Sequence, residues 1–381
     1  RISDEVLRAR IQVRIGEPLN RAALEADIEQ IYGLELFENI RYEIVEEEGR
    51  KGIVLHVQER RWGPNYLQFG LSSANNFKGD SSLNFGLAYT RTAINTLAGE
   101  WRTAVQLGRD PSGFTELYQP LDVDSRYFVN PTLYYRTTNS NLFVNGKRTT
   151  EYRSSRYGAI LAGGRELGTW GEVRLGYNLS AGESEVLIGD HTQPDRDFTN
   201  AELFARLSLD TLNEIPFPSG GNAGALEFIS SQEPFASDTD YNQITVNWLS
   251  ARTWERYTFI GSALCETTLD SDAPMESLFT TGGLLRLSGF AQDELSGQHL
   301  GLLRLVAFRR FGDFALLPIY AGGSLEQGNV WDRYEDIEPG NTMIAGSLFL
   351  GVDTPIGPVY LGYGMAEYGH ESLYLYLGKL F

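Results

Sequence analysis

Over most of this chain, apolar and polar residues alternate with a period of two. The pattern is plain in residues 83–90, LNFGLAYT, and in residues 101–107, WRTAVQL, and it sets in from Trp62 onward. Side chains of a β-strand point alternately to opposite faces, so this period predicts strands with one apolar face and one polar or small face. A soluble β-sandwich and a membrane β-barrel both give such alternation, so the period alone does not choose between them.

The number of such runs favours the barrel. About sixteen runs occur, at residues 65–74, 81–91, 99–108, 113–120, 127–138, 149–166, 171–186, 198–210, 222–233, 241–252, 256–267, 299–311, 314–330, 343–353, 357–367 and 371–381. Roughly 20 residues per strand fit ~10 membrane residues plus alternating short turns and longer loops. We therefore expect a mainly β fold, with a 16-stranded antiparallel transmembrane β-barrel over residues 62–381 and a small α/β domain over residues 1–61.

Composition narrows the class of protein and its partners. No run of ~18 consecutive apolar residues exists, so a helical membrane span is excluded by the length that the hydrocarbon core demands. Abundant Gly (41), Tyr (20) and Phe (20) suit many strands joined by turns, and the single cysteine, Cys265, cannot form an internal disulfide. The net charge of -18, without a cluster of Lys and Arg, argues against nucleic acid as a partner.

The N-terminal residues have helical periodicity before strand periodicity. Helices are expected over residues 3–11, capped by Ser3, and from Asn20 to Gly33, followed by a hairpin with strands near 40–44 and 53–57. This order and the segment 32–42, YGLELFENIRY, resemble a POTRA domain, the polypeptide-transport-associated module. The resemblance implies a β-α-α-β-β order, so we expect the first strand upstream of Arg1. Any other small α/β domain is the alternative.

The carboxy-terminal segment, residues 373–381, reads LYLYLGKLF and ends on an aromatic residue. It resembles the terminal signal by which outer-membrane barrels are recognised for insertion, which implies the barrel assembly machinery as a partner at that stage. Leu377, Gly378 and Phe381 are its candidate signal and seam residues. An edge strand of this kind would invite aggregation in water, whereas in a barrel it pairs with the first strand and closes the wall.

A long loop is expected at residues 282–301, GGLLRLSGFAQDELSGQHLG, with Arg286, Gly289 and Phe290 as its candidate functional residues. It resembles the lumen-plugging loop of the family that includes the barrel assembly machinery and the two-partner secretion translocators. That family usually reads Arg-Gly-Phe or Arg-Gly-Tyr, whereas Leu287 and Ser288 intervene here. The resemblance implies that the loop folds into the barrel lumen.

A second motif suggests what holds that loop. Residues 323–331, GSLEQGNVW, look like the family's Phe-x-Asp-x-Gly-x-x-Trp strand motif, with Glu326 in the Asp place and Gly328 in the Gly place. A carboxylate inside a barrel needs a counter-ion, and arginine can bond it bidentately. We therefore predict that Arg286 pins the loop to Glu326. The segments 210–221, DTLNEIPFPSGG, and 353–364, DTPIGPVYLGYG, match turns of the same family.

Within that family, the Leu-Arg-Leu-Ser-Gly-Phe run of the loop and the single POTRA-like domain resemble one branch. It is the carboxy-terminal POTRA-plus-barrel translocator of patatin-like phospholipase autotransporters, a type V secretion subclass. The resemblance implies a bacterial outer-membrane location, with the N-terminal domain in the periplasm and outer-membrane lipid and lipopolysaccharide as partners. It also implies export and surface anchoring of the chain's own N-terminal lipase passenger. A two-partner secretion or outer-membrane protein assembly translocator is the alternative.

Other classes of function fit less well. A hydrolase needs a nucleophile with a base, yet no Gly-x-Ser-x-Gly motif occurs. Of the four histidines, His56 is expected in the hairpin, and His191, His299 and His370 are expected in loops or at strand ends, where solvated polar residues are usual. No His or Cys pair has metal-ligand spacing, so no catalytic site, metal or cofactor is expected. The pairs Asp238/Asp240 and Asp270/Asp272 fit solvated loops better than ion sites at the lipopolysaccharide surface. A passive porin would need neither a POTRA domain nor an inward loop.

Two mechanistic expectations follow from this interpretation. Pairing between the first strand, 65–74, and the last strand, 371–381, is expected to be the weakest seam of the wall, able to open sideways. The hairpin at positions 40–57 is expected to hold the unfolded passenger by adding a strand to its exposed edge.

Overall fold

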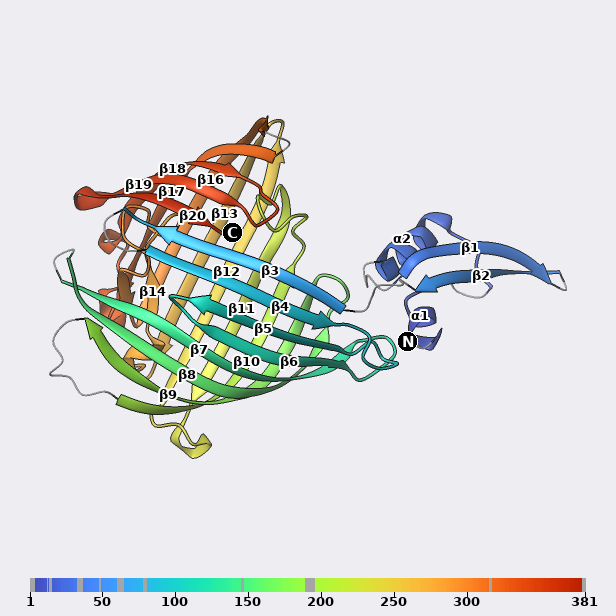
Figure 1. Ribbon diagram of the computed structural model, residues 1–381, viewed down its shortest axis with the longest axis horizontal. Helices are drawn as coiled ribbons and strands as arrows, with labels where there is room; N and C mark the ends of the chain where they lie inside the picture. The colour runs from blue at the N-terminus through green and yellow to red at the C-terminus, as the bar shows by residue number, and fades with distance from the viewer. Residues whose placement is uncertain are drawn as a thin grey trace.

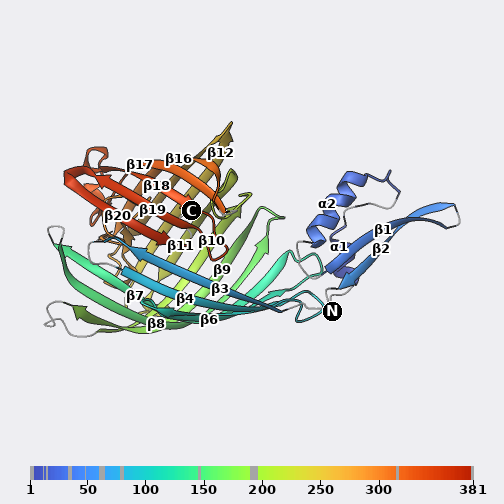
Figure 2. The same cartoon turned by 45° about the horizontal axis from the view of Figure 1, so that its top comes forward.

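The computed structural model of the chain describes residues 4–11, 13, 16–32, 37–47, 49–59, 65–77, 81–144, 147–188, 196–314 and 317–378. It has a small α/β part and a large β-barrel (Figure 1, Figure 2). Of the residues singled out above, Arg1, Ser3, Gly33, Trp62, His191 and Phe381 lie outside the described ranges. None of the described helices is long and apolar enough to cross a membrane.

The α/β part has its core where two helices meet a hairpin. Helices α1 (Asp4–Ala9) and α2 (Arg21–Tyr32) precede the antiparallel strands β1 (Phe37–Glu47) and β2 (Arg50–Glu59). The side-chain oxygen of Asn20 accepts a hydrogen bond from the Ala23 amide at 3.2 Å, as expected of the predicted N-cap. Leu24 and Ile31 of α2 are buried in a cluster with residues of β1. The predicted order of helix, helix, strand and strand is confirmed.

The larger part is a closed antiparallel barrel, in which the last strand returns to pair with the first. Its sixteen strands are β3 (Asn65–Asn75), β4 (Ser81–Arg91), β5 (Glu100–Gly108), β6 (Ser112–Pro120), β7 (Tyr127–Val144), β8 (Lys147–Glu166), β9 (Gly171–Ile188), β10 (Arg196–Asp210), β11 (Gly220–Ser231), β12 (Tyr241–Trp254), β13 (Tyr257–Leu269), β16 (His299–Phe314), β17 (Leu317–Trp331), β18 (Met343–Val352), β19 (Val359–Ala366) and β20 (His370–Leu377). Each predicted run overlaps one of these strands, so the predicted 16-stranded barrel is confirmed. Short 3-10 turns η1 (Glu233–Phe235), η3 (Tyr334–Asp336), η4 (Pro339–Asn341) and η5 (Glu367–Gly369) lie in the connections.

The wall is much taller on one side than on the other. Strands β7, β8 and β9 have 18, 20 and 18 residues, whereas β18, β19 and β20 have 10, 8 and 8. The long strands are teal to green in Figure 1 and the short strands are red. Among the described residues, β20 and β3 are joined by only three pairs, in which Leu375, Tyr376 and Leu377 face Asn75, Ala74 and Ser73. The expected closure of the last strand onto the first is therefore present, but it is short.

Alternation along the strands separates an apolar outer face from an inner face of small and polar residues. On β20, Leu373 and Leu375 are exposed, whereas the alternate residues Ser372 and Tyr374 are buried. The same phase continues on β19, where bulky exposed residues alternate with buried glycines. In a membrane barrel the exposed apolar set faces lipid, and the buried set faces the lumen. Cys265 is exposed on β13, in phase with exposed aromatic residues of that strand.

The connection from β13 to β16 begins at the barrel end opposite the α/β part, because β3 and β13 run in the same direction. It contains η2 (Met275–Ser277) and a small sheet of β14 (Phe279–Thr281) and β15 (Leu295–Gly297). Residues 282–294, here called the lumen loop, turn back inside and contact inward side chains of β17 and β20. The predicted loop over 282–301 ends earlier than expected, because His299 begins β16 and Gly301 pairs with Asn329 in the wall.

Candidate functional site in the barrel lumen

Glu326 is the main anchor of the lumen loop. It points inward from β17 and is fully buried (0% exposed). Its carboxylate accepts hydrogen bonds from the Ser288 amide at 2.8 Å, the Ser288 hydroxyl at 2.7 Å and the Ser324 hydroxyl at 2.5 Å. Hydrogen bonds to an ionised acceptor are stronger than neutral ones, so these contacts fix Ser288 firmly against the wall.

The cation beside Glu326 comes from the wall. Arg304 of β16 is the cross-strand partner of Glu326, and the two charges attract each other. Its Nε donates to the Ser262 hydroxyl at 2.9 Å, and its Nη1 donates to the Leu285 carbonyl at 3.1 Å. Arg304 therefore supplies the charge that the buried carboxylate needs and also holds the loop from a second strand.

The predicted ion pair between Arg286 and Glu326 is wrong. Arg286 is exposed toward the lumen cavity, and its Nη2 donates to the Thr280 carbonyl at 2.7 Å. The cause is the local backbone, since Leu285 and Leu287 on either side have φ values of 65° and 63°, in the left-handed region. These conformations turn both leucines into the packed core and leave the arginine between them facing open space.

Gly289 and Phe290, both predicted site residues, attach the loop to the last strand. The Gly289 amide donates to the Tyr374 hydroxyl at 2.8 Å, and that hydroxyl donates to the Phe290 carbonyl at 2.6 Å. The Phe290 ring stacks on His370 with centroids 4.2 Å apart. Gly289 has a φ of 115°, and a Cβ there would lie 2.7 Å from the Ala366 amide nitrogen. Only glycine fits this position.

Two inward glycines of β19 make room for the loop. A Cβ on Gly362 would lie 2.7 Å from the Leu284 side chain, and one on Gly364 would lie 2.6 Å from the Ser288 Cβ. The segment around them, predicted as a turn followed by a strand, thus forms the seat of the loop. Gly328 has another role, because a Cβ there would lie 2.3 Å from the Gly301 carbonyl oxygen in the neighbouring wall strand.

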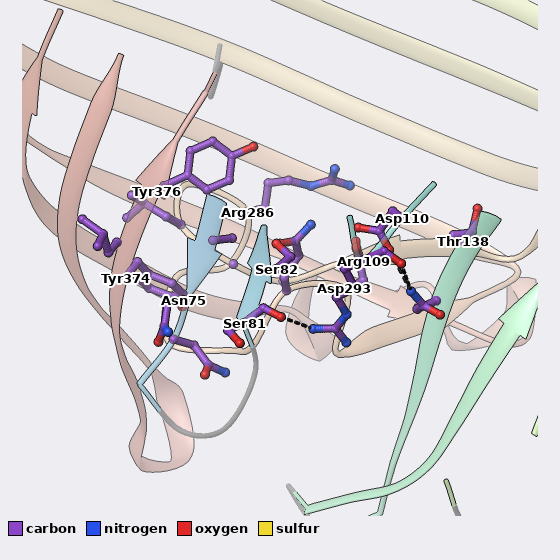
Figure 3. Close-up of a pocket in the computed structure, with 18 of the residues that line it drawn as sticks. Asn75, Ser81, Ser82, Arg109, Asp110, Thr138, Arg286, Asp293, Tyr374 and Tyr376 are labelled. Atoms are coloured by element: carbon purple, nitrogen blue, oxygen red, sulfur yellow. Dashed lines mark hydrogen bonds between the residues drawn. The ribbon is translucent and has the colours of Figure 1, made fainter. Parts of the chain in front are cut away.

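A cavity of about 550 Å³ lies beside the lumen loop (Figure 3). Most of the residues that line it are polar, among them Asn75, Ser81, Ser82, Arg109, Asp110, Thr138, Arg286, Asp293, Tyr374 and Tyr376. Several of these groups are already satisfied by the wall, since Arg109 pairs with Glu151 at 3.1 Å and the Asp110 carboxylate accepts from the side-chain Nδ2 of Asn139 at 2.8 Å. The loop and both strands of the closing pair border the same space.

The terminal residues show a turn after a short ladder. Leu377 ends β20 and pairs with Ser73. Gly378 has a φ of 129°, a backbone conformation that favours glycine, and its amide donates to the Pro358 carbonyl at 2.9 Å. Phe381 lies outside the described residues, and its role as a terminal signal stays a prediction.

The α/β part touches the barrel at the turn between β6 and β7. The Nη2 of Arg10 donates to the Ser125 hydroxyl at 3.0 Å. Within this turn, Asp122 accepts hydrogen bonds from the Arg126 and Tyr127 amides at 2.8 and 3.0 Å. Burial acts to raise the pKa of Asp122, but these hydrogen bonds and the Arg126 side chain outweigh it and lower the pKa below its usual value.

Three residues of the site escaped the sequence-based prediction: Ser288, Arg304 and Tyr374. Ser288 reads as an interruption between Arg286 and Gly289, although it is the residue that bonds Glu326. Strand alternation could place Tyr374 on the inner face, but no local pattern signals its loop partner.

Elsewhere in the described residues, no three His, Cys, Asp or Glu side chains group as a metal site. His299 bonds the Thr267 hydroxyl at 2.7 Å.

A closed barrel with a small α/β domain at one end, and a loop from the other end anchored in its lumen, defines a class of outer-membrane translocation and assembly barrels. The chain belongs to the Omp85 superfamily, because the model described as the Omp85 superfamily domain matches residues 113–379. The model described as POTRA, surface antigen variable number repeat, matches residues 1–60. The chain is therefore an outer-membrane barrel with its POTRA domain in the periplasm, and this POTRA-plus-barrel part of the protein is a transporter and not an enzyme.

Solved structures with this fold include BamA from Haemophilus ducreyi lacking POTRA domains 1–3, CdiB from Acinetobacter baumannii and CdiB from Escherichia coli. Their sequence identities to this chain are 13%, 13% and 16%, with TM-scores of 0.75, 0.61 and 0.64. The alignments cover 98%, 99% and 99% of this chain and 81%, 72% and 74% of the other chains. No curated protein sequence matches the chain. At sequence identities this low, the structural likeness shows a common fold and no more.

Proposed function

We propose that this barrel exports a polypeptide across the outer membrane and anchors it at the cell surface, and that the polypeptide is a patatin-like lipase passenger fused on its N-terminal side. One arrangement carries the export function: the anchored lumen loop, the cavity of about 550 Å³ and the short closing pair border one another. Membership of the Omp85 superfamily agrees with it. The lipase passenger is supported by residues 282–290, GGLLRLSGF, which resemble the loop of patatin-like autotransporters.

The route we propose is through the closing pair. β20 shares eight residue pairs with β19 but three with β3 in the described residues, so the β3 side is the easier side to separate. Separation would expose unpaired backbone N–H and C=O groups on both strands. Such an edge is a template for pairing with another strand, which gives a passing polypeptide a place to bind.

The POTRA domain is proposed to hold the unfolded passenger before it enters. β1 and β2 form a two-stranded sheet in the described part of the domain, so the sheet offers an edge for strand addition. Photo-crosslinkers at positions 40–57 are expected to capture the passenger during export. Capture that never occurs from any of these positions contradicts this step.

A disulfide across the closing pair tests the export route. The full-length protein carries Asn75→Cys and Leu375→Cys, which face each other, in a Cys265→Ser background. Surface display of the passenger, measured by protease accessibility on intact cells, is expected to fall to background when the disulfide forms and to return with a reductant. The matched control joins Leu133→Cys to Ala159→Cys between β7 and β8 and should leave display unchanged. Normal display with the closing pair locked contradicts the proposed route.

A two-partner secretion or outer-membrane protein assembly translocator is the second candidate. The fold likeness to CdiB and BamA supports it. The same crosslinkers decide between the candidates, because they would capture a separately encoded protein instead of the chain's own N-terminal segment.

A further inference from the structure

We propose that Tyr374 is a positioning residue that couples the lumen loop to the closing strand pair, so that release of the loop and separation of β3 from β20 occur together. The proposal rests on the proposed export function. It deepens that function by naming the side chain through which the loop and the seam are linked.

The contact is a two-way hydrogen bond on one buried hydroxyl. Tyr374 is 6% exposed and projects into the lumen from β20 (Figure 3). Its oxygen accepts from the Gly289 amide at 2.8 Å, while its proton goes to the Phe290 carbonyl at 2.6 Å. The Gly289 N–H and the Phe290 carbonyl, which form the tip of the loop, therefore both bond the same side chain. A phenylalanine would keep the ring and its packing but leave both groups without this partner.

The position of Tyr374 in the wall distinguishes it from the other anchors. Arg304 and Glu326 hold the loop to β16 and β17, away from the seam. Tyr374 lies on the closing strand itself, directly before Leu375, where the ladder to β3 begins. In the described residues, its hydroxyl is the side-chain group that hydrogen-bonds Gly289 and Phe290 of the loop to β20. The other edge of β20 pairs with β3 through three residue pairs.

The linkage acts in both directions. Withdrawal of the loop takes away the inner contact that holds β20 in place. Movement of β20 takes the hydroxyl away from the Gly289 N–H and the Phe290 carbonyl, which are buried and would lose their partner. Each change therefore makes the other less costly, as thermodynamic linkage requires. A polypeptide entering the cavity would contact the loop, β20 and β3 together, because all three line it.

The first measurement compares Tyr374→Phe with Tyr376→Phe in purified protein reconstituted in lipid nanodiscs. Tyr376 is the matched control, since it faces the same cavity from the same strand and loses the same hydroxyl. Hydrogen exchange of residues 65–75 and 370–377, followed by mass spectrometry, is expected to speed up about fivefold in Tyr374→Phe, the effect of one typical net hydrogen bond. Equal exchange in the two variants overturns the proposal.

The second measurement tests the reverse direction. A 4-fluorophenylalanine at position 290 reports, by fluorine NMR, how much of the loop is released. Locking the seam through Asn75→Cys and Leu375→Cys in the Cys265→Ser background should reduce the released population in the parent and in Tyr376→Phe, but not in Tyr374→Phe. A merely stabilising hydroxyl would not abolish this response. The same reduction in Tyr374→Phe overturns the coupling.

A third variant, Gly364→Ala, tests the proposal if Tyr374→Phe does not fold. Gly364→Ala changes no hydrogen-bonding side chain but places a methyl group against Ser288, so it displaces the loop tip. Faster exchange of β3 and β20 is expected, and a displaced loop with unchanged exchange overturns the proposal. None of these measurements needs export. Absence of coupling in the parent protein, with export that stops when the seam is locked, refutes this inference alone. Coupling in the parent, with normal export through a locked seam, refutes the proposed route alone.

Discussion

At the scale of the residue, the lumen site depends on how a buried carboxylate is satisfied. The Glu326 carboxylate accepts two hydrogen bonds from Ser288 and one from Ser324, and Arg304 is the neighbouring positive charge. A carboxylate can accept at both oxygens, whereas a glutamine of the same shape presents an NH2 group to one set of donors. The wall chemistry therefore requires an acid at this position.

Glu326→Gln is expected to lower the free energy of unfolding by about 1–3 kcal/mol, the cost of leaving buried partners unsatisfied. Arg286→Ala should change it by less than about 1 kcal/mol, because Arg286 is exposed and its guanidinium donates one hydrogen bond, to the Thr280 carbonyl of β14. Heat-modifiable electrophoresis and urea unfolding in detergent measure both changes. A larger loss for Arg286→Ala than for Glu326→Gln would contradict the geometry of the site.

At the scale of the element, strands could be predicted because their period is local. Residues 65–74 and 241–252 show it directly, and β3 and β12 occupy nearly those ranges. The path of the lumen loop could not be predicted, because it depends on left-handed φ values at Leu285 and Leu287. Such values cost a leucine about 1–2 kcal/mol each, and only the packing around the folded loop offsets that cost. The resemblance located Gly289, Phe290 and Glu326, but the partners came from the tertiary structure.

The short β3–β20 ladder predicts which part of the wall opens first on heating. The seam disulfide between positions 75 and 375 should raise the temperature of barrel unfolding in heat-modifiable electrophoresis, because it constrains the least paired strands. The disulfide between positions 133 and 159 should raise it less, since β7 and β8 are already joined by a long ladder. Equal effects of the two disulfides would indicate that the closing pair is not the weak point.

At the scale of the whole molecule, a small polar contact links the POTRA domain to the barrel in the described part of the chain. Arg10 bonds Ser125 and is attracted by Asp124 in the turn between β6 and β7. A partly buried contact of this kind is worth about 1 kcal/mol, which restricts the POTRA orientation without fixing it.

Arg10→Ala is expected to broaden the distance distribution between spin labels at Glu29→Cys and Thr169→Cys, in the Cys265→Ser background. The population of the docked orientation should fall about fivefold, and higher salt should act in the same direction. Arg8→Ala is the matched control, because Arg8 is exposed on α1, two residues before Arg10. Identical distributions for both variants would contradict a docking role for Arg10.

The unequal height of the wall has a consequence for the surrounding membrane. Strands of 8 residues, such as β19 and β20, are about 26 Å long and, tilted by ~40°, cover only about 20 Å of depth, against an apolar band of about 25 Å. The bilayer beside the seam then has to become thinner, at a cost of fractions of a kcal/mol per Å of hydrophobic mismatch. Strands of 18 to 20 residues on the opposite side impose no such thinning. The bilayer is thus already perturbed on the side of the proposed exit, so under that proposal part of the cost of a polypeptide's passage is borne before it arrives.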